Sequence, residues 1–415
     1  MMLKAVAGLM LVFGAAVADG PDAWSHWRGP ERNGVARGGA PLQWSDGEHI
    51  AWKAQVPGRG HSSPVIWGDR IFLTTAVPTG KGGPQPEQKL TVLALDRKTG
   101  KLLWERVARV ATPHEGYHSQ YGSFASHTPA VDSKHVIASF GSRGVYCYTH
   151  DGQPVWEKDL GIQMRMTMAF GEGSAPALDG DTLALLYDHE GDSLLVALDK
   201  NTGRELWRAP RPPGSTWSSP LIASVGGRKQ AIVAATKFVG GYDLESGKLI
   251  WQVKGLGRNV IPMPVIADGI AIVMSGYQSP NLLAIRLGGE GDLSGSILWQ
   301  NQRGNSYTPS PVVQDGKLYM LTDNGTLSCL DVKTGKPFYA QQRLPKAYSF
   351  KASPVAANGK LYLATEDGDV VVVGMGEKFE TLATNTLEGQ MFIATPAIMD
   401  GEIYLRGQNT LFCIR

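Results

Sequence analysis

Cysteine is scarce in this chain, and its distribution excludes several kinds of site. The 415 residues include only three cysteines, Cys147, Cys329 and Cys413, which lie far apart. No Cys-x-x-Cys-His motif occurs, so no covalent c-type haem can be attached. The phosphate-binding Gly-Lys-Ser/Thr loop and the Gly-x-Ser-x-Gly nucleophile elbow are also missing. The sequence therefore lacks the short signatures of a P-loop nucleotide hydrolase or a serine hydrolase.

Long apolar runs and an excess of one charge are lacking as well. Forty basic residues stand against 38 acidic ones, and this balance gives no reason to expect binding to nucleic acid or to an anionic membrane surface. The apolar run from Ala5 to Ala16 is too short to span a bilayer, and no later stretch approaches the roughly twenty apolar residues of a membrane helix. We therefore expect no transmembrane segment in the mature chain.

The start of the chain has the features of an export signal. Lys4 precedes the apolar run, and Ala16-Val17-Ala18 has the small residues of a cleavage site. We predict a signal peptide at residues 1–18, an N-terminal extension at 19–43 and a single domain at 44–415. The mature protein is then periplasmic or secreted, and without a cysteine near the cleavage point a lipid anchor is not expected there.

Glycine and proline are abundant instead, and they mark an internal repeat. The 51 glycines and 25 prolines are spread along the whole chain, which is typical of many short strands separated by turns. One motif, here called the Pro motif, places a Ser, Thr, Ala or Met before a proline and an apolar segment. Its eight copies are Ser63-Pro64, Thr128-Pro129, Ala175-Pro176, Ser219-Pro220, Met263-Pro264, Ser310-Pro311, Ser353-Pro354 and Thr395-Pro396.

A second motif, the turn–aromatic motif, runs from a small residue through Asp and Thr/Ser-Gly to an aromatic residue. Clear copies lie at 94–104, 197–207, 241–251 and 329–339, and looser ones at 147–156 and 284–299. The glycine supplies the positive φ of a hairpin turn, and the aromatic residue begins the next strand. A large ring that recurs once per repeat is suited to wedging between neighbouring sheets.

The two motifs predict an all-β fold, an eight-bladed β-propeller of four-stranded antiparallel blades, because one repeat cannot bury its own faces. The last repeat stops at Arg415, just where its aromatic segment should begin, whereas an orphan aromatic segment at Trp52 precedes the first Pro motif. We therefore expect the N-terminal strand to pair into the last blade near residues 411–414 and close the ring. The seventh repeat has Phe379 and no Trp, which leaves its register open.

These motifs resemble those of the pyrroloquinoline-quinone-repeat family of eight-bladed propellers, the quinoprotein alcohol dehydrogenase-like proteins. That family includes quinoprotein alcohol dehydrogenases and the propeller subunit of the bacterial outer-membrane β-barrel assembly machine. The resemblance covers residues 44–415, and the runs 24–30 and 58–64 are similar to a secreted bacterial branch. It implies the fold but hardly the activity. Active quinoproteins typically carry an adjacent Cys-Cys pair against the cofactor, and nothing in this sequence matches it.

The three cysteines each occupy the small-residue position of the turn–aromatic motif, where other repeats have Ala or Gly. Because they belong to different repeats, we expect three buried free thiols rather than a disulfide or a metal site.

The segment 114–118, HEGYH, matches the zinc-protease pattern in its letters. In those enzymes a helix sets both histidines on one face. Here the segment follows a proline, contains a glycine and lies between two strands, so a helix has no room to form. We expect no metalloprotease and no metal site, and the alternative left open is a metal held from loops by His114, His118 and His127.

A propeller gathers the loops before its innermost strands around one mouth of the central channel. In this chain those loops are basic and aromatic, which suits a planar anionic ligand held by cations and a stacking face. Glu172 is the nearest acidic candidate. A solvated channel lined by mutually satisfied polar groups is the alternative. The candidate ligand-binding residues are Arg59, His61, His118, His127, Arg165, Trp217, Arg258, Asn259, Tyr307 and Lys351.

Two functions fit this sequence. The favoured one is a rigid, non-catalytic binding or scaffold module, a monomer without cofactor that engages a protein or carbohydrate partner at one face. The alternative is a dehydrogenase that binds pyrroloquinoline quinone with calcium at the channel mouth and oxidises an alcohol or a sugar. Arg59, Arg165, Arg258 or Lys351 would then neutralise the cofactor, and Trp217 would form a stacking floor.

Overall fold

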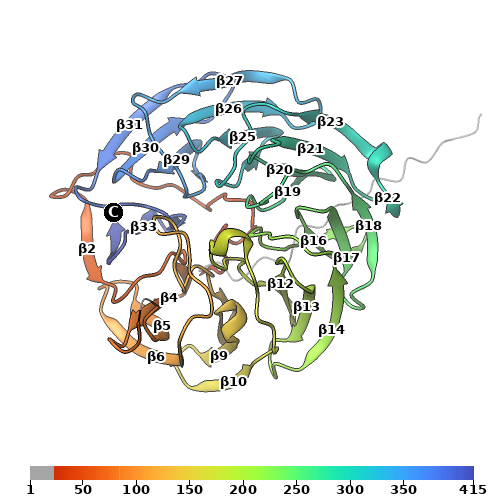
Figure 1. Cartoon of the computed structure of the whole chain (residues 1–415). Helices are drawn as coiled ribbons and strands as arrows, with labels where there is room; N and C mark the ends of the chain where they lie inside the picture. Colours follow the sequence, from red (N-terminus) through yellow and green to blue (C-terminus); the bar gives the residue numbers. More distant parts are fainter. Residues whose placement is uncertain (1–22, 84) are drawn as a thin grey trace, which may run out of the picture.

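The computed structural model describes residues 23–83 and 85–415, which form a closed ring of eight β-sheets around a central axis (Figure 1). The predicted all-β, eight-bladed propeller is therefore confirmed. The predicted signal peptide at residues 1–18 lies outside the described residues. Within the described ranges, no helix has the length and apolar character needed to cross a membrane.

Each blade begins with a short strand directly after a Pro motif and continues outward as an antiparallel meander. The strands of the first four blades are, for blade 1, β1 (Ala23–Trp24), β3 (Val65–Trp67), β4 (Arg70–Pro78), β5 (Gln88–Asp96) and β6 (Leu102–Ala111); for blade 2, β7 (Ala130–Val131), β8 (His135–Ser139), β9 (Val145–Thr149) and β10 (Pro154–Lys158); for blade 3, β11 (Ala177–Asp179), β12 (Thr182–Tyr187), β13 (Ser193–Asp199) and β14 (Glu205–Arg211); and for blade 4, β15 (Leu221–Val225), β16 (Arg228–Val233), β17 (Val239–Asp243), β18 (Leu249–Val253) and β22 (Gly291–Asp292).

The second half of the ring repeats this arrangement, and three short 3-10 helices lie in the connections between strands. The remaining elements are, for blade 5, β19 (Val265–Ala267), β20 (Ile270–Ser275), β21 (Asn281–Arg286) and β23 (Ile297–Asn301); for blade 6, β24 (Val312–Gln314), β25 (Lys317–Leu321), β26 (Thr326–Asp331) and β27 (Pro337–Arg343); for blade 7, β28 (Val355–Ala357), β29 (Lys360–Ala364), β30 (Asp369–Gly374) and β31 (Thr381–Thr386); for blade 8, β32 (Ala397–Met399), β33 (Glu402–Arg406), β34 (Thr410–Ile414) and β2 (Ile50–Gln55); and the helices η1 (Gly141–Arg143), η2 (Thr167–Ala169) and η3 (Ser294–Ser296).

Two blades depart from the four strands predicted for each. In the described chain, blade 1 gains β1, which pairs antiparallel with the innermost strand β3, and blade 4 gains β22, which pairs parallel with the outer strand β18. The strand β22 comes from the insertion in the fifth repeat. Both additions are two residues long, and such short strands carry no alternating pattern that a sequence could reveal.

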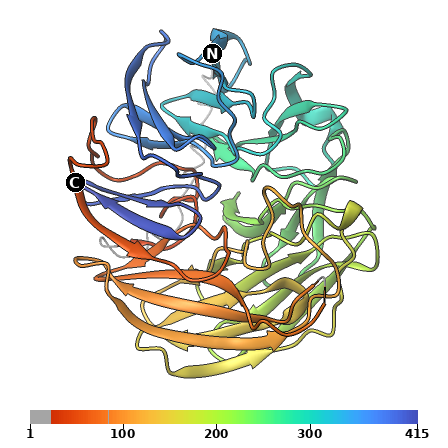
Figure 2. The same cartoon turned by 60° about the vertical axis from the view of Figure 1, so that its left-hand side comes forward.

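The ring closes as predicted, because β2 pairs antiparallel with β34 and places Trp52 opposite Cys413. Figures 1 and 2 both show the orange-red β2 beside the blue C-terminal strands. Without this pairing, β34 would be an exposed edge strand of blade 8 and β2 would have no partner strand.

The small and aromatic positions of the turn–aromatic motif lie directly opposite each other on neighbouring strands. All three cysteines pair in this way, are buried and are free thiols, which confirms the prediction for them. Burial raises the pKa of Cys147 and of Cys413 to about 12, so neither thiol is a ready nucleophile. The opposed pairs are Ala94 and Trp104, Cys147 and Trp156, Ala197 and Trp207, Gly241 and Trp251, Ala284 and Trp299, Cys329 and Tyr339, and Cys413 and Trp52.

Five of the six motif tryptophans bond to the next blade and pack on its turn, as the sequence predicts, whereas Trp251 donates to Gln230 of its own blade. The indole N–H of Trp156 donates to the Lys200 carbonyl of the next blade at 2.7 Å, and its ring lies over the turn glycine Gly203. A Cβ atom on Gly203 would stand 2.6 Å from the ring, so this glycine provides both a positive φ and clearance. The same bond and contact recur for Trp52 with Arg97 and Gly100, Trp104 with His150 and Gly152, Trp207 with Leu244 and Gly247, and Trp299 with Val332 and Gly335.

Blade 7 reverses the sizes of this pair, which settles its register. Val372 lies opposite Ala383, so the position of the large ring holds a methyl group. Trp44, from the chain before β2, is buried in the same core as Ala383, stacks on Tyr362 at 6.5 Å between centroids, and donates its backbone N–H to Asn385. We infer that Trp44 fills the space which the missing wedge would occupy.

Residues 23–36, here called the plug, lie across the inner strands near the ring axis (Figure 1). The Arg28 guanidinium donates to the carbonyls of Pro311 and Pro354, 2.7 and 2.8 Å away, in blades 6 and 7. Arg32 reaches the carbonyls of Leu178 and Ile222 in blades 3 and 4. The plug therefore bonds to opposite sides of the ring at once.

Candidate functional site

A cavity of about 460 Å³, here called the mouth cavity, lies at the ring axis among the loops that precede the Pro motifs. All eight of these loops contribute to its lining, and Trp27 of the plug forms part of its wall. The residue two positions before each Pro-motif residue lines it without exception among the described blades: His61, Ser126, Gly173, Trp217, Ile261, Thr308, Lys351 and Ile393.

A circle of hydrogen bonds, here called the hydroxyl belt, holds the Pro motifs together around the axis. The backbone N–H of a Pro-motif residue donates to the side-chain hydroxyl of the corresponding residue in the next blade. The pattern is interrupted where that next residue is Ala175 or Met263, which have no hydroxyl. The six links present run from Ser63 to Thr128, Ala175 to Ser219, Met263 to Ser310, Ser310 to Ser353, Ser353 to Thr395 and Thr395 to Ser63, with distances from 2.8 to 3.1 Å.

Aromatic side chains form much of the cavity wall. His118 stacks on Tyr121 with centroids 4.6 Å apart, and Tyr277 stacks on Tyr307 at 5.4 Å. The indole N–H of Trp217 donates to the Gly171 carbonyl at 2.6 Å, which fixes its ring. His118 and Tyr121 share one loop, whereas Trp217, Tyr277 and Tyr307 come from three others, so the folded ring of blades is what brings these side chains together.

The rim carries an exposed apolar side chain on a strained backbone. Met168 in η2 lines the cavity, has 77% of its surface exposed and adopts φ of 52°, and Ala169 shares the same φ. Left-handed φ values are uncommon for residues with a Cβ atom and cluster where structure serves binding. An exposed methionine can adapt to varied apolar partners.

Five of the ten sequence-predicted site residues line the mouth cavity: His61, His118, Trp217, Tyr307 and Lys351. Burial, with the nearby Arg406 and Arg59, lowers the pKa of His61 to about 3, so this imidazole is neutral. It contacts the Gly122 carbonyl at 3.2 Å and helps to position the loop 117–126.

The other five predicted residues are not part of the lining. Arg59 donates to two carbonyls of the loop 119–120, and Arg165 donates to the Glu190 carbonyl at 2.9 Å. Arg258 is exposed, and its neighbour Asn259 is buried with φ of 55°. His127 is buried in the wall of a smaller cavity. Of the four basic residues predicted to gather at the mouth, Lys351 lines the cavity, and Arg59, Arg165 and Arg258 do not.

The charge of Lys351 is offset within the wall. Its ammonium group lies 3.4 Å from Asp323, 3.3 Å from Glu366 and 4.5 Å from the Tyr121 ring centroid. Two carboxylates and an aromatic face thus surround one cation. An anionic ligand would have to compete with both carboxylates for it.

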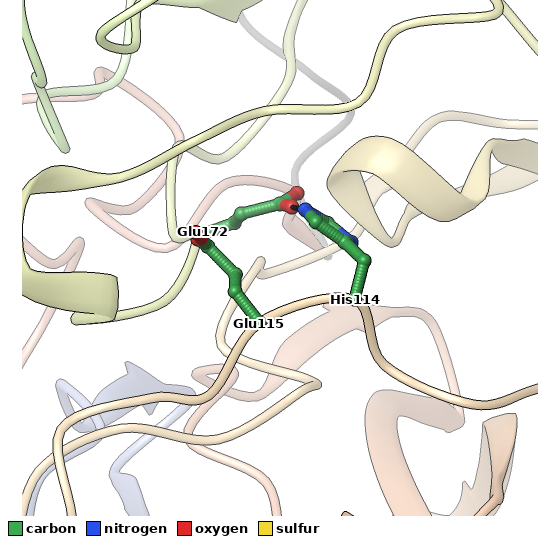
Figure 3. Close-up of side chains that lie close together, drawn as sticks. All are labelled: His114, Glu115 and Glu172. Atoms are coloured by element: carbon green, nitrogen blue, oxygen red, sulfur yellow. Dashed lines mark ion pairs between the residues drawn. The ribbon is translucent and has the colours of Figure 1, made fainter.

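The segment 114–118 (HEGYH) is not helical, as predicted, and its two histidines lie in different surroundings. His114 approaches Glu115 and Glu172 so that one atom of each lies within 4.8 Å of the others (Figure 3), whereas His118 lines the mouth cavity. Burial raises the pKa of Glu172 and that of Glu115. The Glu172 carboxylate accepts from the backbone and side chain of Ser142, at 2.7 and 2.6 Å.

Both ring nitrogens of His114 are already engaged in hydrogen bonds. Nε2 lies 2.6 Å from the Met164 carbonyl, and Nδ1 lies 3.2 Å from the Arg143 guanidinium. With a carbonyl on one side and a cation on the other, the imidazole has no free lone pair for a metal. This donor set therefore fits a hydrogen-bonded junction between loops better than a metal centre.

Sequence reasoning missed Trp27, Tyr121, Phe170, Met168 and Tyr277 in the cavity wall. A usable signal existed in the spacing of the repeat, because the position two residues before each Pro motif residue is the one that faces the axis. Read at that position, the chain gives two isoleucines, a glycine, a tryptophan, a serine, a threonine, a histidine and one lysine, which predicts a mostly neutral lining.

Comparisons with known proteins agree with this architecture. The family model described as outer membrane protein assembly factor BamB matches residues 35–125, 88–341 and 286–378. The BamB of Yersinia pestis is 23% identical over 280 residues, covering 62% of this chain and 63% of that protein. The BamB of Burkholderia pseudomallei is 25% identical over 297 residues, covering 70% and 68%. The match thus spans less than two thirds of the Yersinia protein.

Solved structures share the fold at low identity. BamB from Moraxella catarrhalis superposes with a TM-score of 0.61 at 11% identity, over 88% of this chain and 98% of that one. A europium-containing methanol dehydrogenase superposes with a TM-score of 0.66 at 13% identity, over 94% and 90%. BamB and a methanol dehydrogenase both have this fold, so likeness of fold leaves activity open. The family match covers well over half of the residues, and the chain therefore belongs to the PQQ_2 family, described as outer membrane protein assembly factor BamB.

Proposed function

We propose that this chain is a non-catalytic binding platform of the periplasm or the cell exterior, which engages a protein or carbohydrate partner at the mouth face. The observation that carries the proposal is the mouth cavity itself: an aromatic, charge-balanced hollow built from all eight entry loops of a closed ring. A largely apolar concave site with a few placed polar groups is the usual form of a binding site. Family membership supports a scaffold role, because the relatives are named as assembly factors.

The quinone-dependent alternative needs groups that this cavity does not offer. A planar quinone with several carboxylates requires free cations, whereas Lys351 is paired with Asp323 and Glu366. A calcium ion requires accessible carboxylate oxygens, whereas both oxygens of Glu172 accept hydrogen bonds from Ser142. The residues present therefore do not fit the cofactor, and no reaction step is assigned to them.

Site-specific cross-linking tests the platform. A photoreactive amino acid at Met168, on the rim, should form a discrete cross-linked product in an extract of the source organism, and the Trp217→Ala variant should lose it. The same photoreactive group at Phe338, exposed on the outer strand β27, is the matched control and should not give this product. Equal products from both positions, or a product indifferent to Trp217→Ala, would contradict binding at the mouth.

A second measurement separates the platform from the enzyme. A ligand that binds only the folded state must raise the melting temperature. The platform does not bind pyrroloquinoline quinone, so adding the quinone with calcium should leave the melting temperature unchanged. A rise that disappears in Trp217→Ala would favour the dehydrogenase.

A further inference from the structure

The inner part of the mouth cavity holds hydrogen-bond donors that the protein itself does not use. Each belt hydroxyl accepts a backbone N–H, and among the described residues none of them donates its own proton. A Ser or Thr hydroxyl has one donor and two acceptor sites, so each retains an O–H and a lone pair. The five belt hydroxyls that line the cavity are those of Ser63, Thr128, Ser219, Ser353 and Thr395.

The two interruptions of the hydroxyl belt add backbone donors. By the pattern of the belt, the N–H of Thr128 should donate to residue 175 and that of Ser219 to residue 263, but these are alanine and methionine. Neither N–H has an acceptor in the parts of the chain that the structure describes. Ala175 itself lines the cavity, so an oxygen atom from outside the protein can stand where the missing hydroxyl would be.

The cavity also offers flat aromatic faces, from Trp217 and from the stacked pair of Tyr277 and Tyr307. A fitting occupant therefore presents a flat apolar face and several oxygen atoms together. A purely apolar amino-acid side chain would cover the rings but leave the inner donors without acceptors, which is costly once water is displaced. An anion would meet a lysine whose charge is already offset.

We infer that the mouth cavity binds a neutral sugar ring, with its C–H face against the aromatic wall and its oxygens toward the belt hydroxyls and the gap at Ala175. The face of a sugar ring carries C–H groups that stack on aromatic rings, and its hydroxyls both donate and accept. Such a ligand satisfies the donors and the rings together. This inference rests on the proposed function and names the chemical group that the platform holds.

Titration of the full chain tests the assignment. Glucose, galactose, mannose, N-acetylglucosamine and their disaccharides are added at fixed ionic strength, with succinate and a short Phe/Leu-rich peptide as competing chemistries. At least one sugar should change the tryptophan fluorescence saturably and raise the melting temperature. If none of these sugars binds, or if succinate or the peptide binds in their place, the inference is overturned.

Variants then locate the sugar. Trp217→Ala should abolish the response, and Phe338→Ala should leave it unchanged. Ala175→Ser supplies the missing acceptor of the belt, so it should raise the melting temperature of the free protein yet weaken sugar binding by about tenfold, the equivalent of one displaced hydrogen bond. Unchanged affinity in Trp217→Ala or in Ala175→Ser would overturn the inferred pose.

The two proposals fail separately. Absence of sugar binding with a cross-link from position 168 that still depends on Trp217 would remove the sugar and keep the platform. Loss of that cross-link as well would remove the platform.

Discussion

The backbone N–H of Thr395 donates to Oγ of Ser63 at 3.0 Å, which joins residues 332 positions apart in the chain. This bond links blade 8 to blade 1 at the axis, while the pairing of β2 with β34 completes blade 8 at the rim. The ring is therefore closed at two places: the hydroxyl of Ser63 closes it near the axis, and the strand β2 closes it at the outer rim. The inner closure also explains why a hydroxyl residue so often precedes the motif proline.

Removing the inner acceptor should weaken the closure measurably. Ser63→Ala leaves the buried N–H of Thr395 without its partner, and an unpaired buried donor costs about 1 to 3 kcal/mol. The midpoint of urea unfolding should fall accordingly. Ala175→Ser, which adds an acceptor where the belt is open, is the control and should move the midpoint upward. Equal midpoints for Ser63→Ala and the parent would contradict the role of the belt.

Deleting the outer closure should have a larger effect. Without residues 45–56, β34 loses its outer partner β2, and the turn of blade 1 at Gly100 loses the ring of Trp52. An open propeller exposes sheet edges, so we expect a broad, non-cooperative melting transition and aggregation. Calorimetry on the deleted and full chains provides the comparison, and a deleted chain that melts like the full one would show that ring closure is dispensable.

The wedge can be separated from the turn with two glycines of blade 3. Gly203 has φ of 69° and lies under Trp156, whereas Gly180 has φ of 56° and open space around it. Gly→Ala at either position costs about 1 to 2 kcal/mol for the left-handed backbone. At Gly203 the displaced indole should add to that cost, since a Cβ atom would stand 2.6 Å from the ring. Equal losses of unfolding free energy in Gly203→Ala and Gly180→Ala would mean that the ring moves without penalty.

The features that the sequence could predict are those encoded in the period of the repeat. The opposition of Cys329 to Tyr339 and the pairing of Trp52 with β34 both follow from motif positions that recur in most of the repeats. The plug could not be predicted, because residues 23–36 have no period and their contacts are made by long side chains such as Arg28. The role of Trp44 could not be predicted for the same reason. This residue lies far from blade 7 in the sequence, and it stacks there on Tyr362.

The site was predicted less well than the fold because loops of different length follow no shared geometry. Residues two positions before a Pro-motif residue, such as Trp217 and Lys351, face the axis because the rigid strand beyond them fixes their direction. Arg59 stands four positions before its Pro-motif residue and Arg258 stands five before its own, and neither side chain lines the mouth cavity. The charge of Lys351 is balanced by Asp323 and Glu366, which belong to turns of two different blades and come together only when the ring has folded.

Buried histidines should make the fold sensitive to acid. Burial lowers the pKa of His127 from 6.5 to about 4, so between these pH values the unfolded chain binds more protons than the folded one. Stability should therefore fall as the pH falls from about 6.5 to 4, by up to about 3 kcal/mol from this residue. Glu172, whose pKa burial raises, opposes this trend.

The contribution of His127 is isolated by comparing variants. His127→Gln should flatten the dependence of the unfolding free energy on pH between 7 and 4, because glutamine binds no proton in either state. His49→Gln changes an exposed imidazole and serves as the control. Urea titrations at several pH values measure the slopes, and an unchanged slope in His127→Gln would show that the buried imidazole is not the source of acid sensitivity.

The plug depends on an arginine that has no carboxylate partner. Arg28 is fully buried, burial lowers its pKa to about 9, and within the described ranges no acidic side chain lies at ion-pair distance from it. Its charge is met by the carbonyls of Pro311 and Pro354 and by the face of Trp27, 5.5 Å away. A planar, two-armed guanidinium can reach both carbonyls at once, which a single ammonium group cannot do.

Arg28→Lys should therefore loosen the plug while the ring stays folded. One proline carbonyl loses its donor and the charge stays buried, so we expect a loss of about 2 to 4 kcal/mol of unfolding free energy. Release of the plug should expose the mostly buried residues 23–36 to thermolysin, and it should alter the fluorescence of Trp27, which lines the mouth cavity. Arg37→Lys is the matched control, because Arg37 is exposed and pairs with Glu31 at the surface, where ion pairs contribute little. If Arg28→Lys is cleaved no faster than Arg37→Lys, the carbonyl contacts of the Arg28 guanidinium do not hold the plug, and the hydrogen bonds of Arg32 and the packing of Trp24 keep it in place.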